Sequence, residues 1–201
     1  MTIAIVDYGM GNMRSVARAI GHVGGSAVVT DRADEALAAD GLVVPGVGHF
    51  GACMANLRER GLDAVVKDFA SSGQPVFGVC VGMQVLLEGS EEASGVAGLG
   101  LLEGVCRRLP NDVKVPHMGW NEVEWTALHP YAAGIAQDTR FYFVHSFAPD
   151  VSPSTIGVTE HGRPFAAALA RDNVFATQFH PEKSGRPGLS LYEAFVREVA
   201  V

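Results

Sequence analysis

The sequence predicts an α/β protein in which helices flank a mostly parallel central sheet and the C-terminal half adds antiparallel strands. Two observations predict this class. Over residues 2–88, short apolar runs that scarcely alternate are followed by segments of helical periodicity, as expected for strands buried on both faces of a parallel sheet. After residue 100, the pattern changes to short strand-like runs. The length of 201 residues suits a single domain over residues 1–201.

The first half of the chain alternates predicted strands and helices. An apolar run at 2–7 leads into a helix over 13–23, and Asn12 is expected to cap that helix. Gly61 is expected to break a long helical segment over 50–72. The other predicted strands are 27–30, 41–44 and 75–79, and the other helices are 31–39 and 82–88.

The second half consists mainly of short predicted strands. Residues 89–95 are expected to form a loop, and residues 161–164 a hairpin turn. Antiparallel strands at one edge of the parallel sheet would explain this half. An amphipathic helix over 187–199, with a proline at its start, closes the chain. The predicted strands are 101–109, 113–117, 120–126, 139–144, 154–160, 164–170 and 173–178.

Composition excludes several classes of partner. The net charge is −7 and no long run of Lys or Arg occurs, so nucleic acid and anionic membranes are poor partners. No apolar run approaches the roughly 20 residues of a membrane span, and the first residues do not form a signal sequence. A cytoplasmic location is therefore expected. The three cysteines include no C-x-x-C, which indicates free thiols and no metal site.

The stretch 75–84 has the pattern of a nucleophile elbow. A short apolar run leads into G-V-C-V-G, centred on Cys80, and a helix-like segment follows. At a helix N-terminus the helix dipole lowers the pKa of a thiol, which favours a thiolate nucleophile. The alternative is a buried cysteine in a glycine-containing turn.

A catalytic cysteine needs a base, and the segment Q-F-H-P-E supplies a candidate. His180 follows a strand-like run, and Glu182 lies two residues further on, within reach of the imidazole. The alternative is a surface histidine before a turn. We expect Cys80 as nucleophile, His180 as general base and then acid, and Glu182 as the residue that holds the imidazole.

Backbone N–H groups near the cysteine are expected to form an oxyanion hole. Val81 follows Cys80 at the predicted helix start, and the turn P-G-V-G offers Val47 and Gly48 at the end of another strand. Working groups gather beyond the C-terminal ends of parallel strands, so these turns should face one pocket. The set suits acyl transfer at a carboxamide or ester.

Three blocks of sequence resemble the triad-type (class I) glutamine amidotransferases: P-G-V-G at 45–48, G-V-C-V-G-M-Q at 78–84 and Q-F-H-P-E-K-S at 178–184. Further blocks, at 7–12, 114–121 and 142–147, resemble the glutaminase subunits of imidazole glycerol phosphate synthases. The resemblance covers nearly the whole chain.

The resemblance implies an activity and a partner. It implies hydrolysis of L-glutamine to glutamate and ammonia, without a cofactor. The ammonia would pass to a separate (β/α)8-barrel cyclase subunit, which makes imidazole glycerol phosphate and an aminoimidazole carboxamide ribotide in histidine biosynthesis. It also implies that the glycine-containing turn at 45–48 changes conformation when the cyclase acts.

The resemblance also assigns residues to the glutamine pocket: Gln84, Glu92, His145, Ser146 and Phe147. A carboxylate at Glu92 suits the α-ammonium of glutamine, although a solvated loop carboxylate is the alternative. Many relatives carry Tyr at the position of Phe147, so a side-chain hydrogen bond from that position is lost and only backbone contacts would remain.

Four positions match residues that meet the cyclase in the resembling family: Asn12, Met118, Trp120 and Lys183. Tryptophan is a favoured interface anchor, but Trp120 could equally be a core aromatic. Lys183 could pair with an acidic residue of the cyclase or remain solvated.

Two other functions remain open from the sequence. The chain could be a glutaminase that serves another synthase, such as those of pyridoxal phosphate or anthranilate synthesis, although the block at 114–121 argues against this. It could also be a non-catalytic redox sensor that uses Cys80 as its thiol, which would need no His–Glu pair.

Overall fold

The computed structural model describes residues 1–200 and contains a large mixed sheet as its main layer. Eight strands lie in the order β2-β1-β3-β4-β13-β12-β11-β8. The strands from β2 to β13 are mutually parallel, and β12, β11 and β8 are added antiparallel at one edge. This confirms the predicted class. The bounds are β1 Ile3–Val6, β2 Ala27–Thr30, β3 Gly41–Gly46, β4 Val76–Cys80, β8 Glu124–Trp125, β11 Thr155–Glu160, β12 Pro164–Arg171 and β13 Val174–Thr177.

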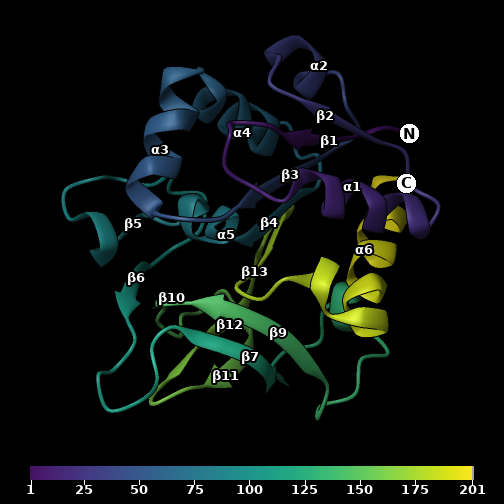
Figure 1. Cartoon of the computed structure of the whole chain (residues 1–201). Helices are drawn as coiled ribbons and strands as arrows, with labels where there is room; N and C mark the ends of the chain where they lie inside the picture. Colours follow the sequence, from purple (N-terminus) through teal and green to yellow (C-terminus); the bar gives the residue numbers. More distant parts are fainter. Residues whose placement is uncertain (201) are drawn as a thin grey trace.

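Helices pack in two groups on the sheet. In one, α1 contacts α6; in the other, α4 contacts α2 and α3, and α3 contacts α5. Figure 1 shows these groups on either side of the parallel strands, with the two chain ends close together. Gly61, at φ 69°, separates α3 from α4 as expected. The bounds are α1 Met13–His22, α2 Ala33–Leu37, α3 Phe50–Glu59, α4 Leu62–Ser71, α5 Val81–Leu86 and α6 Gly185–Val199.

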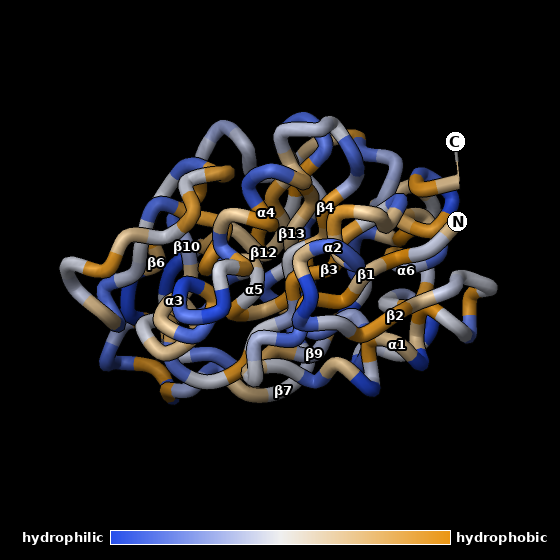
Figure 2. The backbone as a smooth tube through the Cα atoms, turned by 90° about the horizontal axis from the view of Figure 1, so that it is seen from above, coloured by the Kyte–Doolittle hydropathy of each residue, from blue (hydrophilic) through white to orange (hydrophobic). Residues whose placement is uncertain are grey.

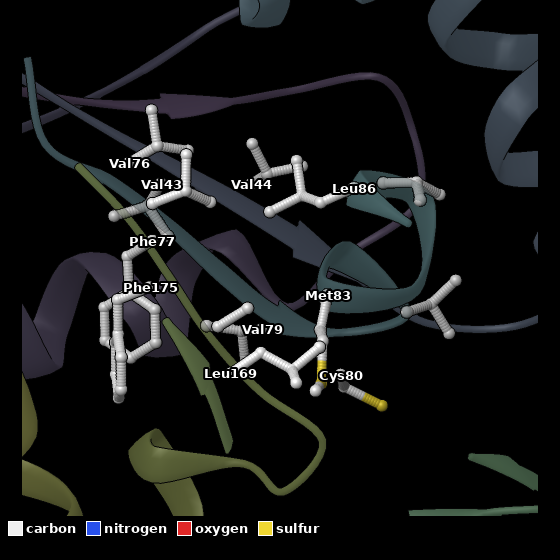
Figure 3. Close-up of a cluster of buried hydrophobic side chains, with 14 of the residues drawn as sticks. Val43, Val44, Val76, Phe77, Val79, Cys80, Met83, Leu86, Leu169 and Phe175 are labelled. Atoms are coloured by element: carbon white, nitrogen blue, oxygen red, sulfur yellow. The ribbon is translucent and has the colours of Figure 1, made fainter. Parts of the chain in front are cut away.

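The core lies between the sheet and its helices. All four residues of β1 and all five of β4 are buried, which explains the lack of alternation in these runs. Figure 3 shows Val43, Phe77 and Phe175 in the buried cluster, with Cys80 at its edge. In Figure 2 much of the tube through the central strands is orange, and blue segments lie mainly toward the outside. Each fully buried Val or Phe side chain contributes about 1.5–3 kcal/mol to stability.

Two small sheets correct the prediction that every later strand joins one edge of the large sheet. A three-stranded sheet has the order β10-β6-β5, and a two-stranded antiparallel sheet pairs β7 with β9. The bounds are β5 Gly89–Ser90, β6 Val105–Arg108, β7 His117–Glu122, β9 Arg140–His145 and β10 Phe147–Pro149. Figure 1 shows β7 and β9 together below the parallel strands.

Several predicted boundaries in this half were wrong. The strand expected at 113–117 is absent over 113–116, because Pro116 lacks the N–H that a sheet ladder needs; β7 begins at His117. The strand expected at 120–126 is divided between β7 and β8, and the one at 101–109 shortens to β6. The predicted loop 89–95 contains β5 and the 3-10 turn Glu91–Ala93, and β10 was not predicted.

Helix α1 begins at Met13 as predicted but its cap differs from the expectation, and α6 begins earlier than predicted. Asn12 occupies the cap position of α1, but its side chain makes no capping hydrogen bond; its backbone carbonyl accepts from Ser15 N and Val16 N. Helix α6 begins two residues before Pro187, which still falls in the first turn, where its missing N–H is tolerated. Among residues 1–200, no helix is long and apolar enough to span a bilayer.

Candidate active site

Cys80 occupies a strained turn between β4 and α5. It is the last residue of the strand and caps the helix, with φ 57° and ψ −113°. Such a backbone costs on the order of 1–3 kcal/mol in a residue other than glycine. The strain is typical of an elbow that holds a nucleophile at a strand end.

Close backbone contacts explain the glycines of this turn. A Cβ on Gly82 would overlap the Val44 carbonyl oxygen, and a Cβ on Gly46 would overlap the backbone nitrogen of Gly82. On Gly78 it would lie 2.6 Å from Leu86 Cδ1. The glycines on both sides of the cysteine therefore let β3, β4 and α5 approach closely, as the motif predicted.

His180 and Glu182 form a buried pair beyond the end of β13. His180 Nδ1 lies 2.8 Å from Glu182 Oε1, and the two side chains are 2% and 1% exposed. Pro181 starts a 3-10 turn (Pro181–Lys183) that brings the two side chains to the same side. The backbone N–H of His180 donates to Tyr142 O at 2.9 Å, which ties this turn to β9.

The charge state of His180 depends on its neighbours. Burial alone lowers the pKa of the imidazole, but Cys80 and Glu182 together raise the pKa of His180 to about 10. The Nε2 atom of His180 is buried without a hydrogen-bond partner of good geometry. The Cys80 sulfur is nevertheless near enough to raise the pKa of the imidazole. The arrangement favours an imidazolium beside the sulfur in the resting protein.

A cavity of about 170 Å³ brings the predicted site residues together. Cys80 and His180 line it with the three residues predicted to supply the oxyanion hole, Val47, Gly48 and Val81. The five residues predicted to bind substrate also line it: Gln84, Glu92, His145, Ser146 and Phe147. Glu182 lies behind His180.

Two contacts that the sequence did not predict hold the end of β3 and the turn that follows it. The Tyr8 hydroxyl donates to the Pro45 carbonyl at 2.6 Å, and the Cys53 thiol donates to the Val47 carbonyl at 3.5 Å. Gly48 adopts φ 88°, a conformation that glycine accepts without strain. The Pro45 and Val47 carbonyls are therefore held by side chains from the protein interior, while Val47 and Gly48 line the cavity.

Gln178 is a site residue that sequence analysis missed. Gln84 Nε2 donates to Gln178 Oε1 at 3.0 Å and to the Phe147 carbonyl at 3.1 Å. Gln178 Nε2 in turn points at Cys80 Sγ from 3.9 Å. The available signal was its place two residues before His180 in the same block.

Glu92 is anchored at the start of a helix. The residue is partly buried, and its Oε2 accepts from the backbone N–H of Phe50 at 2.6 Å, at the first residue of α3. The N-terminus of a helix favours a negative charge. A freely solvated loop carboxylate, the alternative considered above, does not describe it.

The residues predicted to meet a partner lie close to the site. Met118 and Trp120 are 61% and 54% exposed on β7, so Trp120 is not a core residue. The Trp120 ring packs edge-to-face on the Tyr142 ring at 6.1 Å, and Lys183 Nζ lies 5.7 Å from the centre of the Tyr142 ring. Asn12 is partly buried and borders a recess with His180 and Glu182.

The other two thiols are not equivalent to Cys80. All three cysteines are free and buried. Burial raises the pKa of Cys53 to about 11 and the pKa of Cys106 well above its ordinary value, so neither is a thiolate at neutral pH. In the part of the chain that the structure describes, no group of three or more His, Cys, Asp or Glu side chains is placed to hold a metal ion.

Comparison with known proteins identifies the class. The family model described as "Glutamine amidotransferase class-I" matches residues 4–199, and the chain belongs to this family. Similar folds occur in a structure described as PurLQS from Thermotoga maritima (TM-score 0.77, 18% identity, 98% of this chain and 97% of the other) and in the glutaminase domain of Trypanosoma brucei CTPS (TM-score 0.67, 17% identity, 100% and 94%).

Sequence relatives point to one member of the family. A Moorella thermoacetica protein named "Imidazole glycerol phosphate synthase subunit HisH" is 47% identical, over 96% of this chain and 93% of its own length. A Deinococcus radiodurans protein of the same name is 48% identical, over 98% and 94%. The similarity therefore extends over nearly the full length of both proteins in each comparison.

Proposed function

We propose that this chain is the glutaminase subunit of an imidazole glycerol phosphate synthase and that it hydrolyses L-glutamine to L-glutamate and ammonia. The observation that carries the proposal is the meeting of Cys80 with the His180–Glu182 pair at one cavity, in a chain of this family. The ammonia would pass to a (β/α)8-barrel cyclase subunit for the synthesis of imidazole glycerol phosphate and aminoimidazole carboxamide ribotide. The full-length relatives named as synthase subunits favour this pathway.

The reaction begins at the Cys80 sulfur. The thiolate attacks the side-chain carboxamide carbon of glutamine, and the carbonyl oxygen becomes an oxyanion. Backbone N–H groups at Gly48 and Val81, at the cavity wall, are the proposed donors to that oxygen. His180 then donates its proton to the nitrogen, the C–N bond breaks, and ammonia leaves behind a thioester on Cys80.

The second half of the reaction reverses the role of His180. The neutral imidazole takes a proton from water, whose oxygen attacks the thioester carbon. The C–S bond then breaks, glutamate leaves, and the thiolate–imidazolium pair is restored. Glu182 acts through the ring: its 2.8 Å contact with Nδ1 keeps Nε2 toward Cys80 and stabilises the imidazolium.

The cavity walls supply the groups that would bind glutamine. Glu92 offers a carboxylate for the α-ammonium, and Gln84, His145 and Ser146 line the same cavity. Phe147 contributes backbone atoms only, because its ring carries no hydroxyl. No cofactor is needed for this chemistry.

The outer surface beside the site is the proposed cyclase interface. Trp120 and Lys183 both contact the Tyr142 ring there, Met118 is exposed on the same strand as Trp120, and Asn12 borders the recess next to Glu182. An exposed tryptophan next to an aromatic ring and a cation is typical of an interface anchor. The chain would work as one domain over residues 1–201 in a cytoplasmic heterodimer.

Mixing the purified chain with the imidazole glycerol phosphate cyclase subunit tests the proposal. A complex and cyclase-dependent glutaminase activity are expected. Absence of both, with activation by the synthase subunits of pyridoxal phosphate or anthranilate formation instead, would assign the chain to another pathway. Absence of glutaminase activity with every partner would favour the redox-sensor alternative, especially if His180→Ala left thiol oxidation unchanged.

A further inference from the structure

A row of buried and partly buried polar side chains runs to the wall of the proposed glutamine pocket. Asn121 Nδ2 lies 3.2 Å from His117 Nε2, and His117 Nδ1 lies 3.0 Å from His145 Nε2. His145 Nδ1 lies 3.0 Å from the Phe147 carbonyl oxygen, which also accepts from Gln84 Nε2 at 3.1 Å. The row therefore ends on a carbonyl at the cavity wall.

The hydrogen bonds of this row allow one direction of donation. Asn121 Oδ1 accepts from the backbone N–H of Glu122, so its Nδ2 is the donor, to Glu160 O and to His117 Nε2. With Nε2 as acceptor, neutral His117 carries its proton on Nδ1 and donates it to His145. His145 then carries its proton on Nδ1 and donates it to the Phe147 carbonyl.

The electrostatics support neutral rings at physiological pH. Burial lowers the pKa of His117 to about 4 and the pKa of His145 to about 3, and neighbouring histidines act in the same direction. One of these neighbours, His161, stacks on His117 at 4.2 Å between ring centres. Its Nε2 lies 2.8 Å from the Lys114 carbonyl oxygen. Both rings of the row thus remain in single tautomers over the working range.

The row lies on the inner face of the strand whose outer face carries the proposed interface. Side chains alternate along β7: His117 is buried and Asn121 partly buried, whereas Met118 and Trp120 are exposed. His117 pairs directly with His145 of β9 in the sheet register. A shift of β7 would therefore move the donor that fixes His145.

We infer that His117, held by Asn121, is a positioning residue for glutamine hydrolysis that fixes the tautomer and orientation of His145 and so the pocket wall at Phe147. The inference rests on the proposed glutaminase function. The same hydrogen bonds connect β7, whose outer face carries the proposed interface, to the glutamine pocket. Asn121 and His117 belong to β7, and the Phe147 carbonyl belongs to the pocket wall.

Three substitutions separate the hydrogen bonds of His117 from its packing. His117→Phe keeps a flat ring between Phe143 and His161, on which His117 stacks at 4.8 and 4.2 Å, but removes both hydrogen bonds. His117→Asn places an amide at the same bond distance from Cα as Nδ1 and can still donate to His145. His117→Gln places its amide at the distance of Nε2 and reaches only toward Asn121.

Steady-state kinetics of the complex with the cyclase provide the first test. His117→Phe and His117→Gln should raise the KM for glutamine about tenfold, since a buried acceptor on His145 loses its donor. His117→Asn should recover most of the wild-type KM, and ammonia-dependent synthesis should not change. Wild-type KM in His117→Phe, or equal KM values in His117→Asn and His117→Gln, would overturn the inference.

Nitrogen-15 NMR of the imidazole rings provides a second test that does not depend on glutaminase activity. In the wild-type chain His145 should be protonated on Nδ1, and in His117→Phe a population protonated on Nε2 should appear. A wild-type spectrum with the proton on Nε2 would overturn the inference. A wild-type chain without glutaminase activity but with the expected His145 tautomer would contradict the proposed function alone. The role of His117 in fixing the His145 tautomer would remain supported.

Discussion

Glu182 Oε1 lies 2.8 Å from His180 Nδ1 in a position almost closed to solvent. The contact leaves Nε2 of His180 as the only ring nitrogen available for proton transfer at Cys80. Only one residue, Pro181, separates the two members of the pair, so the carboxylate and the imidazole are carried by one rigid turn. The geometry explains how a short segment can supply both a base and its orienting group.

Glu182→Gln tests the charge of this carboxylate. The amide fills the same space but cannot stabilise the imidazolium, so kcat for glutamine should fall about 10²- to 10⁴-fold. The KM should change little, because Glu182 does not line the cavity. Glutaminase assays of the complex with the cyclase measure both constants. A kcat within a factor of three of wild type would contradict the orienting role.

The raised pKa of His180 predicts a pH-dependent stability. The folded-state pKa is about 10 and the ordinary value is 6.5, so the stabilisation is complete below pH 6.5 and is lost as the pH rises toward 10. Urea unfolding at a series of pH values should show a decline over this range that is weaker in His180→Gln. His22→Gln, at an exposed position of α1, is the control. Parallel curves for wild type and His180→Gln would contradict the assignment.

The close approach at Gly82 predicts a large cost for one methyl group. Gly82→Ala would push its Cβ into the Val44 carbonyl, and we expect a loss of at least about 2 kcal/mol in the free energy of unfolding. The control is Gly21→Ala in α1, where a Cβ meets no atom within 4 Å and a gain of about 0.5–1 kcal/mol is expected. Chemical denaturation measures both variants, and equal stabilities would contradict the predicted clash.

The local patterns of this chain predicted its parallel half well and its later strands less well. Val43, Val44 and Phe77 belong to runs buried on both faces, and such runs are recognisable without partners. In contrast, β10 (Phe147–Pro149) has three residues and depends on pairing with β6, which no local pattern encodes. The start of β7 was missed although Pro116 marks it.

The site residues divide in the same way: those in short local motifs were predicted, and those whose role depends on contacts with distant residues were missed. Cys80, His180 and Glu182 were predicted because each stands in a short motif at a strand end. Gln178 and His117 were missed as site residues because their contacts come from far along the chain: Gln178 reaches Cys80 across 98 positions. Hydrogen bonds of this kind appear only when the sheet register is known.

Trp120→Ala tests the proposed cyclase interface. The side chain is 54% exposed, so the free chain should lose no more than about 1 kcal/mol of stability. Loss of an interface anchor costs about 2 kcal/mol or more, which corresponds to a Kd for the cyclase at least about 30-fold weaker. Calorimetric titration measures the Kd. The matched control is Leu128→Ala, a fully exposed apolar residue outside the proposed interface, and equal Kd values for both variants would exclude Trp120 from it.

The most direct test of the central claim is covalent trapping at Cys80. The complex with the cyclase is treated with a glutamine-like chloroketone and digested, and the modified peptide is sequenced by mass spectrometry. We predict one label, on Cys80 and not on Cys53 or Cys106, and we predict that Cys80→Ala loses glutamine-dependent but keeps ammonia-dependent synthesis. A label on another residue, or glutamine-dependent activity in Cys80→Ala, would contradict the account.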